Sequence, residues 1–546
     1  MSDLPNRAAS SSVPRSERVL SFAVPILMLL PPFLGMLQAV GHSVWRADSL
    51  TTVAILVGIG ALCGSLVWRG GMLRVIVLAT LLTIAIDLLL KGSASRDSLF
   101  RLLTTSGISA EPLVSAATFA ISFIICWLLQ RHLLQILATS FGVILVTTIL
   151  LPAESSAGPR RTVSTSVTAN GSGPLVLHLI LDEHIGLEGI PADAPGAEDF
   201  RRMLLSFYQE FGFRVYERSY TVYAETRESL PNLVNFSTLD TKGVFLVPPR
   251  SLNHPPFTLT RNALFDQLAQ RGYRIHVYQS DFMDFCSGSQ AAWTDCYVYP
   301  FWGIDPPGDP IALGGRVRLL LSVYVKDSFV YHTARDTLYK RLRRIFPDLV
   351  AWDWERVSSG SLTTIAALRQ LREDLTRASA GHAYFAHLLM PHSPYVYDTA
   401  CRVRHPADWG GSPDQNLYSL AFDQTSCLYK ELRALFEQLQ DAGQLDDAVI
   451  FVHGDHGVRI GAGSSDASTR QDHLDLFSTL YAVKGPGIEP GLERSRRSVN
   501  ELVTEYWTGP SAVHGEPFVL LPESMWDMKL QRRRLSDIGM DPVPPQ

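Results

Sequence analysis

Roughly the first 150 residues of the chain are almost continuously apolar, whereas the remainder alternates short apolar runs with polar stretches. Each apolar segment approaches the ~20 residues needed to cross about 30 Å of hydrocarbon. The polar stripe that a helix of a soluble bundle would carry is almost missing from them. The pattern therefore predicts a transmembrane domain over residues 1–152 with about five α-helices, at Leu20–Val40, Thr51–Trp68, Met72–Leu90, Leu113–Leu129 and Leu133–Leu151.

Arginines gather at one end of these segments, which indicates how the segments are oriented. They precede the first segment, lie between the second and third, and follow the fourth. Because positive residues favour the cytoplasmic side, we expect the amino end in the cytoplasm and, with five spans, everything after Leu151 on the other side of the membrane. Asp87, inside the third segment, is either a functional acid or an acid sheltered within the bundle.

After a polar linker, residues 153–173, four apolar runs end in polar residues: "PLVLHLILDEH", "GYRIHVYQSD", "AYFAHLLMPHSPY" and "AVIFVHGDHG". Such runs are typical of buried parallel strands. Helical stretches such as "LTTIAALRQLREDLTRA" lie between them. The alternation predicts an α/β domain over residues 174–522, with a mostly parallel central sheet flanked by helices, and a tail over 523–546. The polar strand ends should converge on one edge of the sheet.

Charge and cysteine content narrow the class of protein. The formal net charge of −5 argues against nucleic acid as a partner. Four cysteines lie in the domain outside the membrane, where disulfides form, and they allow three pairings. Cys286–Cys296 and Cys401–Cys427 are favoured because each pair is nearest in sequence. Four reduced thiols are the alternative if the orientation is reversed.

The strand ends supply candidate metal ligands. Asp182 and Glu183 stand side by side after the first strand, and their repulsion is costly unless a cation or hydrogen bonds compensate it. Asp455 and His456 follow a later strand, with His473 beyond them. Mixed carboxylate and imidazole ligands suit zinc or manganese better than calcium. Taken singly, each pair is also compatible with a solvated loop or a polar turn.

The stretch "AETRESLPNL" contains a candidate nucleophile, Thr226, followed by Ser229 and Pro231. Thr226 could simply cap the amino end of a helix. That position is compatible with chemistry, because the amino end of a helix favours an anionic phosphate nearby. A metal-bound hydroxyl also loses its proton more easily and becomes a nucleophile.

Together these motifs resemble the alkaline phosphatase/sulfatase superfamily, and above all its membrane-anchored branch, the lipoteichoic acid synthases and phosphoethanolamine transferases of bacterial envelopes. The resemblance covers the whole plan of spans, linker and α/β domain. The acidic ligand after a strand is matched by Asp182 or Glu183, and the Thr-x-x-Ser-x-Pro context by Thr226. The remaining matches are His392 in "PHSPY", the Asp-His-Gly of Asp455, His456 and Gly457, and the later His473.

The resemblance implies a role for each residue. Thr226 would attack the phosphorus of a membrane phospholipid donor and carry the head group as a phosphothreonine. The metal, zinc or manganese, would be held by Asp182 or Glu183 with Asp455, His456 and Thr226. His392 and His473 would bind phosphate oxygens, protonate the leaving group or help a second metal, with Arg227 as a further substrate-binding residue. His387 and His453 are expected to be structural.

The implied function is transfer of phosphoglycerol or phosphoethanolamine from a phospholipid to an envelope glycan or lipid, by a multi-pass protein of the bacterial inner membrane with a periplasmic catalytic domain. Sulfatase activity is not expected, because the Cys/Ser-x-Pro-x-Arg motif is missing. The cysteine-rich neighbourhood of many phosphoethanolamine transferases is missing as well. A hydrolase using the same site, and a non-catalytic envelope regulator on the same scaffold, are the alternatives.

Overall fold

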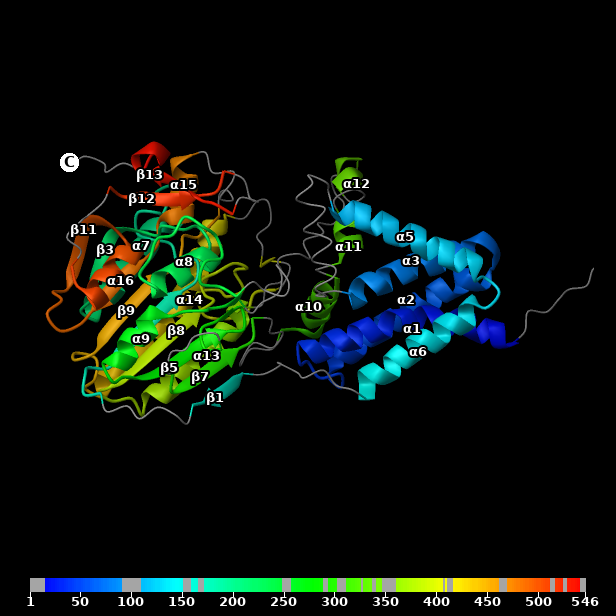
Figure 1. Ribbon diagram of the computed structural model, residues 1–546, viewed down its shortest axis with the longest axis horizontal. Helices are drawn as coiled ribbons and strands as arrows, with labels where there is room; N and C mark the ends of the chain where they lie inside the picture. Colours follow the sequence, from blue (N-terminus) through cyan, green and yellow to red (C-terminus); the bar gives the residue numbers. More distant parts are fainter. Residues whose placement is uncertain are drawn as a thin grey trace, which may run out of the picture. The chain divides into compact units, whose positions relative to one another are not determined.

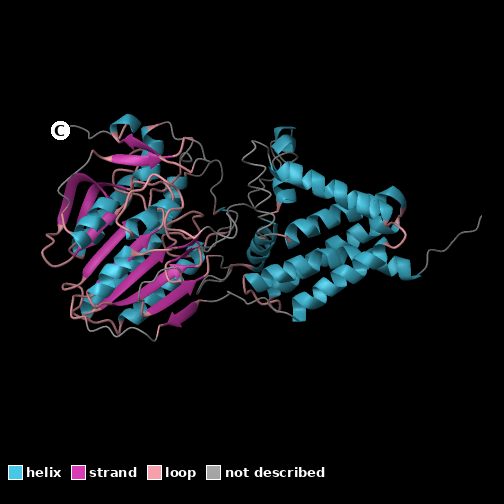
Figure 2. Cartoon of the chain, in the orientation of Figure 1, coloured by secondary structure: helices cyan, strands magenta, loops and turns pink. Residues whose placement is uncertain are grey.

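The computed structural model describes residues 15–540, apart from 91–109, 151–158, 165–170, 248–256, 288–292, 302–310, 326–327, 336–339, 346–359, 406–407, 410–415, 461–468, 511–515 and 524–527. Most of the expected linker and part of the expected tail thus lie outside the described residues. The chain forms two compact units. The first comprises residues 1–157 and 316–355, and the second comprises residues 158–315 and 356–546. Figure 2 shows helices in the first and a mixture of strands and helices in the second.

The first unit is built from the apolar segments. Its helices are α1 (Arg15–Ala39), α2 (Ala47–Trp68), α3 (Gly71–Leu89), α5 (Ala110–Leu128) and α6 (Leu133–Leu150), joined by α10 (Leu313–Val325), α11 (Phe329–Thr333) and α12 (Lys340–Ile345). Among the described residues, α1, α2, α3 and α6 are long and apolar enough to cross a membrane, and Pro112–Leu128 is a shorter apolar helix. All five expected segments are therefore helical, and four of them meet the length and composition of a span.

Two buried acids, Asp87 and Asp48, connect α11 and α10 to the early helices of this unit. Asp87 accepts hydrogen bonds from the Ser328 hydroxyl at 2.6 Å and the Val330 amide at 3.1 Å, so it stabilises the amino end of α11. Asp48, at the start of α2, lies 3.3 Å from Nε of Arg316 on α10. Asp87 is thus a sheltered acid with a partner, the second of the two alternatives for this residue.

The second unit contains a nine-stranded sheet with a parallel centre. Along the sheet the strands are β1 (Arg160–Val163), β7 (Asp295–Tyr299), β5 (Arg274–Ser280), β8 (His382–Leu388), β2 (Val176–Leu181), β9 (Val449–Gly454), β10 (Tyr481–Lys484), β3 (Arg214–Tyr220) and β11 (Gly491–Ser498). Figure 1 shows β5 and β8 running side by side, with β9 further along the same sheet. The pairs β1–β7, β9–β10 and β10–β3 are antiparallel, and the others are parallel. The predicted fold class is confirmed.

Helices cover both faces of this sheet. One layer contains α8 (Thr226–Val234), α9 (Ala263–Gln270) and α16 (Val499–Thr508), and the other contains α7 (Ala197–Glu210), α13 (Gly360–Leu375) and α14 (Leu417–Asp441). Val176 and Ile180 of β2 pack in the first layer's core, and the intervening Leu177 and Leu179 are also fully buried. Burial on both faces is why the strands are continuously apolar rather than alternating.

Smaller elements complete the second unit. They are β4 (Phe257–Thr258), β6 (Met283–Asp284), α15 (Arg470–Phe477), β12 (Phe518–Leu521), β13 (Gln531–Arg534) and the short 3₁₀ helix Ser536–Ile538. The stretch expected to be a tail contributes β13, which pairs with β12, and Met540, which is buried. Disulfides join Cys286 to Cys296 and Cys401 to Cys427, the two pairs favoured by sequence distance.

Candidate active site

The central strands bring two acidic strand ends together. β2 lies between β8 and β9, and its last residue, Leu181, is in register with Leu388 of β8 and Gly454 of β9. The next residues, Asp182 and Asp455, therefore emerge side by side at the carboxyl edge of the sheet. The amide of Glu183 donates a hydrogen bond of 3.1 Å to Oδ1 of Asp455, which links the two strand ends directly.

Three buried side chains, those of Asp182, His387 and Asp455, could hold a metal ion, and they are called the metal-binding group below. Ligand atoms of Asp182, His387 and Asp455 all lie within 4.8 Å of one another. Oδ1 of Asp182, Oδ2 of Asp455 and both ring nitrogens of His387 are buried without a hydrogen-bond partner. Burying such polar atoms without partners is costly, and a divalent cation would satisfy them together. The donor set of carboxylates and imidazoles fits a metal such as zinc or manganese.

His456 lies between this group and Thr226. Its Nε2 is 3.4 Å from Oδ2 of Asp455 and 3.6 Å from Oδ1 of Asp182. Its Nδ1–H donates to the Gly457 carbonyl at 2.9 Å, which leaves a lone pair on Nε2. That lone pair accepts the hydroxyl of Thr226, whose Oγ1 is 3.1 Å away. The hydrogen bonds thus orient the imidazole toward both the carboxylates and the hydroxyl.

Thr226 is the first residue of α8 and is buried. It does not cap its helix: Glu225 occupies the N-cap position and makes no side-chain cap hydrogen bond. Ser229, one turn later, donates to the backbone carbonyl of Asp455 at 2.6 Å, which fixes α8 against the end of β9. The Thr-x-x-Ser spacing therefore places the hydroxyl of Thr226 toward the buried carboxylates while Ser229 holds the helix in place.

The two central carboxylates differ in their proton affinity. Burial, followed by repulsion from Asp455 and Glu183, raises the pKa of Asp182 well above its ordinary range. Burial alone would also raise the pKa of Asp455, but the neighbouring His456 and His387 outweigh it and lower that pKa. One of the two carboxylates is thus favoured in the protonated form until a cation replaces the proton.

Glu183 belongs to a neighbouring arrangement rather than to the metal-binding group. Its Oε1 accepts a hydrogen bond of 2.7 Å from Nε of Arg459, and its Oε2 accepts one of 3.0 Å from the Ser393 amide. His392 lies beside the pair, with Nε2 3.4 Å from Oε1. Glu183 and Arg459 both have positive φ, 60° and 51°. Such strained backbone is found preferentially at functional sites. In the structure Asp182 faces the group of potential ligands, whereas Glu183 binds Arg459.

The other predicted residues lie further out. Arg227 pairs with Glu225 at 2.7 Å, next to Thr226. His473 lies within α15, where Asp472 and the Ile538 carbonyl are its charged and polar neighbours, and no described contact links it to the metal-binding group. His387, which we expect from the sequence to be structural, instead faces Asp182, with 3.9 Å between Nε2 and Oδ2.

Two residues of the site, His387 and Arg459, were not predicted from the sequence. His387 stands inside an apolar strand, so only the pairing of β8 with β2 shows that it reaches the site. Arg459 follows His456 by three residues in "DHGVRIG". The sequence hinted at a positively charged partner only through Glu183, an acid beside Asp182 whose repulsion needs compensation. The residue after His456 has to be a glycine, because a Cβ on Gly457 would overlap the Asp475 carbonyl of α15.

Comparison with known proteins gives one family. The model of the family described as Sulfatase matches residues 213–520. Among solved structures, the zinc complex of the C-terminal periplasmic domain of EcEptC from Escherichia coli is 11% identical, covering 70% of this chain and 99% of that chain at a TM-score of 0.37. The phosphonate monoester hydrolase SpPMH from Silicibacter pomeroyi is 15% identical, covering 62% and 74% at 0.36. No curated protein matches the chain.

Proposed function

The chain belongs to the sulfatase family, and on that basis we propose that it is a membrane-anchored phosphotransferase. It moves a phospho-head group, phosphoglycerol or phosphoethanolamine, from a membrane phospholipid to an envelope glycan or lipid. In this proposal the chain lies in the bacterial inner membrane, with the α/β domain in the periplasm. The four helices apolar enough to span a membrane support an anchor, and a lipid donor would lie in that membrane.

One observation carries the proposal. The hydroxyl of Thr226 is 3.1 Å from His456, whose imidazole lies within 3.6 Å of Asp182 and Asp455. A hydroxyl with a hydrogen-bonded imidazole and adjacent metal-ligating groups is the arrangement of an activated nucleophile. The site is also at the amino end of α8, where backbone amides and the helix dipole favour a phosphate group.

Asp182, His387 and Asp455 would hold a divalent cation beside Thr226, with zinc or manganese as the candidates, and His456 would join them when the Thr226 hydroxyl no longer donates to its Nε2. When bound, such a cation supplies Lewis-acid stabilisation of phosphate oxygens and lowers the pKa of a nearby hydroxyl. The protein contributes the rest: the Ser229 bond fixes the position of Thr226, and the burial of the site excludes water from the nucleophile.

The transfer takes two steps. Thr226 Oγ1 forms a bond to the phosphorus while the bond from phosphorus to the diacylglycerol oxygen breaks, and diacylglycerol leaves with the proton that Thr226 gives up. The oxygen of the acceptor hydroxyl then bonds to phosphorus while the bond from phosphorus to Thr226 Oγ1 breaks, and the proton of the acceptor hydroxyl passes to Thr226. His392, one quarter exposed and 3.3 Å from Nη2 of Arg459, is positioned with that guanidinium to bind phosphate oxygens. We assign no step to His473.

The test replaces the nucleophile and follows the head group. Thr226→Ala should abolish transfer from a phospholipid labelled in the head group, while the purified protein keeps its metal. Thr376→Ala, at an exposed threonine of the same unit, is the matched control and should transfer normally. In the wild type, mass spectrometry of acid-quenched protein should find the head group on the peptide containing Thr226. Full transfer by Thr226→Ala would refute the mechanism.

The same site could also release the head group to water, and product analysis separates this hydrolase from the transferase. With labelled donor, an envelope lipid or glycan fraction should receive the label from the transferase. Release of free phospho-head group at the same rate with and without acceptor would establish the hydrolase. A regulator without activity would contain no tightly bound zinc or manganese on elemental analysis of the purified chain.

A further inference from the structure

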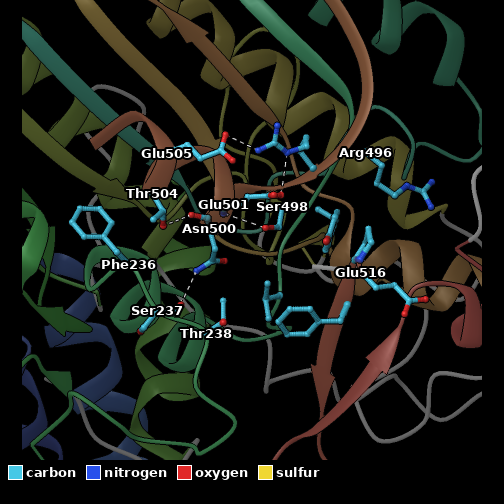
Figure 3. A pocket seen from close by; sticks show the side chains of 15 residues that line it. Phe236, Ser237, Thr238, Arg496, Ser498, Asn500, Glu501, Thr504, Glu505 and Glu516 are labelled. Carbon is cyan, nitrogen blue, oxygen red and sulfur yellow. Dashed lines mark hydrogen bonds and ion pairs between the residues drawn. The ribbon is translucent and has the colours of Figure 1, made fainter. Parts of the chain in front are cut away.

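Outside the candidate active site, charged side chains gather at two places. The first is a cavity of about 490 Å³ beside β11, at the carboxyl ends of β3 and β11. Because β10 is antiparallel to both of its neighbours, these ends lie on the same edge of the sheet as the candidate active site. Arg497 contacts two glutamates of the cavity wall, and Arg496 binds Glu188 outside it. The carboxylates of the wall outnumber its two arginines, so it has no excess of positive charge; Figure 3 shows these carboxylates, Glu501, Glu505 and Glu516.

The second place is one end of the helical bundle in the first unit. The Arg18 guanidinium lies 4.7 Å from the centroid of the Trp68 ring, so the start of α1 and the end of α2 are at the same end of the bundle. The turn between these helices, residues 40–46, is therefore at the opposite end. Residues 40–50, with residues 313–318 of α10 that contact them, are called the outer end, because the proposed orientation places them on the periplasmic side. Positive residues favour the cytoplasmic side, so orientation does not explain the arginines of the outer end.

Two arginines of the outer end share one carboxylate. Asp48 is fully buried, and its Oδ2 is 3.3 Å from Nε of Arg316 and 3.1 Å from Nε2 of His42. Its Oδ1 is 3.6 Å from Nε of Arg46. The side chains of Arg316 and Arg46 are 22% and 39% exposed, so both are accessible from outside the bundle. Because a guanidinium has five N–H donors, each can bind a further anion beside Asp48.

Arg318 stands two residues further along α10 and is half-buried. Among the residues that the structure describes, no carboxylate contacts its guanidinium. Further along the same helix, the Tyr324 hydroxyl donates to the Leu29 carbonyl at 2.9 Å, ten residues or ~15 Å before the end of α1. α10 thus leads from the outer end toward the middle of the bundle, and Arg318 lies near its start. An arginine in such a position is costly unless an anion binds it.

Exposed apolar side chains accompany these arginines. Trp45, directly before Arg46, is 84% exposed, and Leu50, in the first turn of α2, is 46% exposed. Leu313, one turn before Arg316 on α10, is 43% exposed. Tryptophan near the end of a membrane-spanning helix typically lies at the level of the lipid head groups. The outer end therefore combines apolar contacts with guanidinium groups, which is the chemistry that recognises the phosphate of a lipid.

We propose that the outer end binds an anionic phospholipid of the leaflet that faces the periplasm. Arg316 and Arg318 donate hydrogen bonds to its phosphate oxygens, and Trp45 packs against its glycerol and ester groups. A zwitterionic lipid is less suited, because its ammonium would need a carboxylate and Asp48 is buried among basic groups. The inference rests on the orientation given with the proposed function, but it does not depend on head-group transfer.

The test maps a photoreactive lipid onto the full chain. The purified protein is reconstituted in phosphatidylcholine nanodiscs that contain a small fraction of phosphatidylglycerol with a diazirine beside its ester groups, and mass spectrometry locates the label after irradiation. Photoreactive phosphatidylcholine is the zwitterionic comparison. Arg318→Gln removes a charge without leaving a described carboxylate unpaired. Arg69→Gln, at an exposed arginine of the opposite end, is the matched control.

We expect phosphatidylglycerol to label residues 40–50 and 313–318 in the wild type and in Arg69→Gln. Arg318→Gln should receive about fivefold less label, because one arginine at a lipid surface contributes about that factor. Arg318→Lys, which keeps the charge, should retain most of the label. Equal labelling of the wild type by phosphatidylcholine, or equal labelling of Arg318→Gln and Arg69→Gln, would overturn the proposal. So would loss of the label on adding inorganic phosphate, which would assign the site to a free anion.

Thr226→Ala separates this proposal from the proposed function. It should be labelled at the outer end like the wild type while it transfers no head group. Normal transfer by Thr226→Ala with the label retained would count against the proposed mechanism alone. A wild type that transfers the head group but is not labelled at the outer end would count against the lipid site alone.

Discussion

Two regions on one edge of the sheet differ in whether their charged side chains have partners of opposite charge. At the ends of β2 and β9, Asp182 and Asp455 face each other with buried oxygen atoms that lack hydrogen-bond partners. At the ends of β3 and β11, Arg497 contacts two glutamates and Arg496 binds Glu188. Repelling carboxylates indicate a site that needs a cation, whereas at the second place each arginine already has a carboxylate partner. Charge balance thus distinguishes the candidate active site from the wall of the cavity beside β11.

The largest effect should come from removing one repelling carboxylate. Asp455→Asn keeps Oδ1, which accepts from the Glu183 and His456 amides at 3.1 and 2.9 Å, and removes the charge. We expect head-group transfer to fall by about a thousandfold and bound metal to be lost. The metal-free variant should melt no higher than metal-free wild type, because metal-free Asp182 is favoured in the protonated form and the neighbouring histidines stabilise the charge of Asp455.

The control for Asp455→Asn is Asp446→Asn, whose side chain is 95% exposed. It should change neither the metal content nor the melting temperature appreciably. Elemental analysis and differential scanning fluorimetry provide the two readouts. A metal content in Asp455→Asn equal to that of the wild type would contradict the assignment of the carboxylate pair.

The Glu183–Arg459 pair should come next in size. Arg459→Met leaves the buried Glu183 carboxylate with only the Ser393 amide and His392 as partners. We expect the free energy of unfolding to fall by about 3 kcal/mol, since breaking such a pair leaves an uncompensated charge. Adding Glu183→Gln should restore most of that loss. A double mutant no more stable than Arg459→Met, measured by denaturant melts of the purified chain, would show that the two side chains are not coupled.

His387 and His392 separate metal binding from substrate positioning. His387→Asn should weaken metal affinity by about a hundredfold, because its ring nitrogens face Asp182 within the metal-binding group. His392→Asn should leave metal affinity unchanged and lower the rate of transfer. Titration with a metal-competing chelator measures the first, and initial rates measure the second. Equal metal affinities for both variants would remove His387 from the ligand set.

Acid should weaken the strands beneath the active site. Burial, followed by the charge of His453, lowers the pKa of His178 well below its ordinary value of 6.5. Near pH 6.5 the unfolded chain binds a proton on His178 that the folded chain does not bind. The free energy of unfolding therefore falls as the pH drops below that value. The slope is at most about 1.4 kcal/mol per pH unit for this one group.

His178→Gln isolates this contribution. Its side-chain amide can still donate to Nε2 of His453, which accepts from His178 at 2.7 Å. Melting temperatures at pH 7.5, 6.5 and 5.5 should fall less steeply for the variant than for the wild type. Parallel curves for the two proteins would show that His178 does not titrate between folded and unfolded states.

The site could be predicted from the sequence where it depends on strand ends. Asp182, Asp455 and His456 each follow an apolar run, and parallel strands necessarily bring such ends to one edge. Thr226 could be placed because its spacing to Ser229 is local. His387 could not, because its neighbours in the sheet, Ile180 among them, come from strand order, which no single stretch specifies.

The fold diverges from the sequence-based expectation for the same reason. The apolar spans were recognised by length alone, but helices α10 to α12 join the first unit from 160 or more residues further along the chain. Their signal was indirect: Asp87 lies within an otherwise apolar segment and Asp48 just before one, and both acids required partners, which Ser328 and Arg316 supply. The cavity beside β11 also depends on long-range packing, since its wall combines residues 220 to 518.

The smallest effect should come from the rim of the cavity, and it limits how far charge pairing alone explains stability. Glu516 and Arg534 lie 3.1 Å apart, but their side chains are 54% and 64% exposed. Glu516→Gln should change the free energy of unfolding by less than about 1 kcal/mol, because water screens an exposed pair. Measured beside Arg459→Met in the same denaturant series, it shows what burial adds to an ion pair. A loss as large as that of Arg459→Met would mean that pairing, rather than burial, sets the energy at both places, and the contrast between the two regions would then disappear.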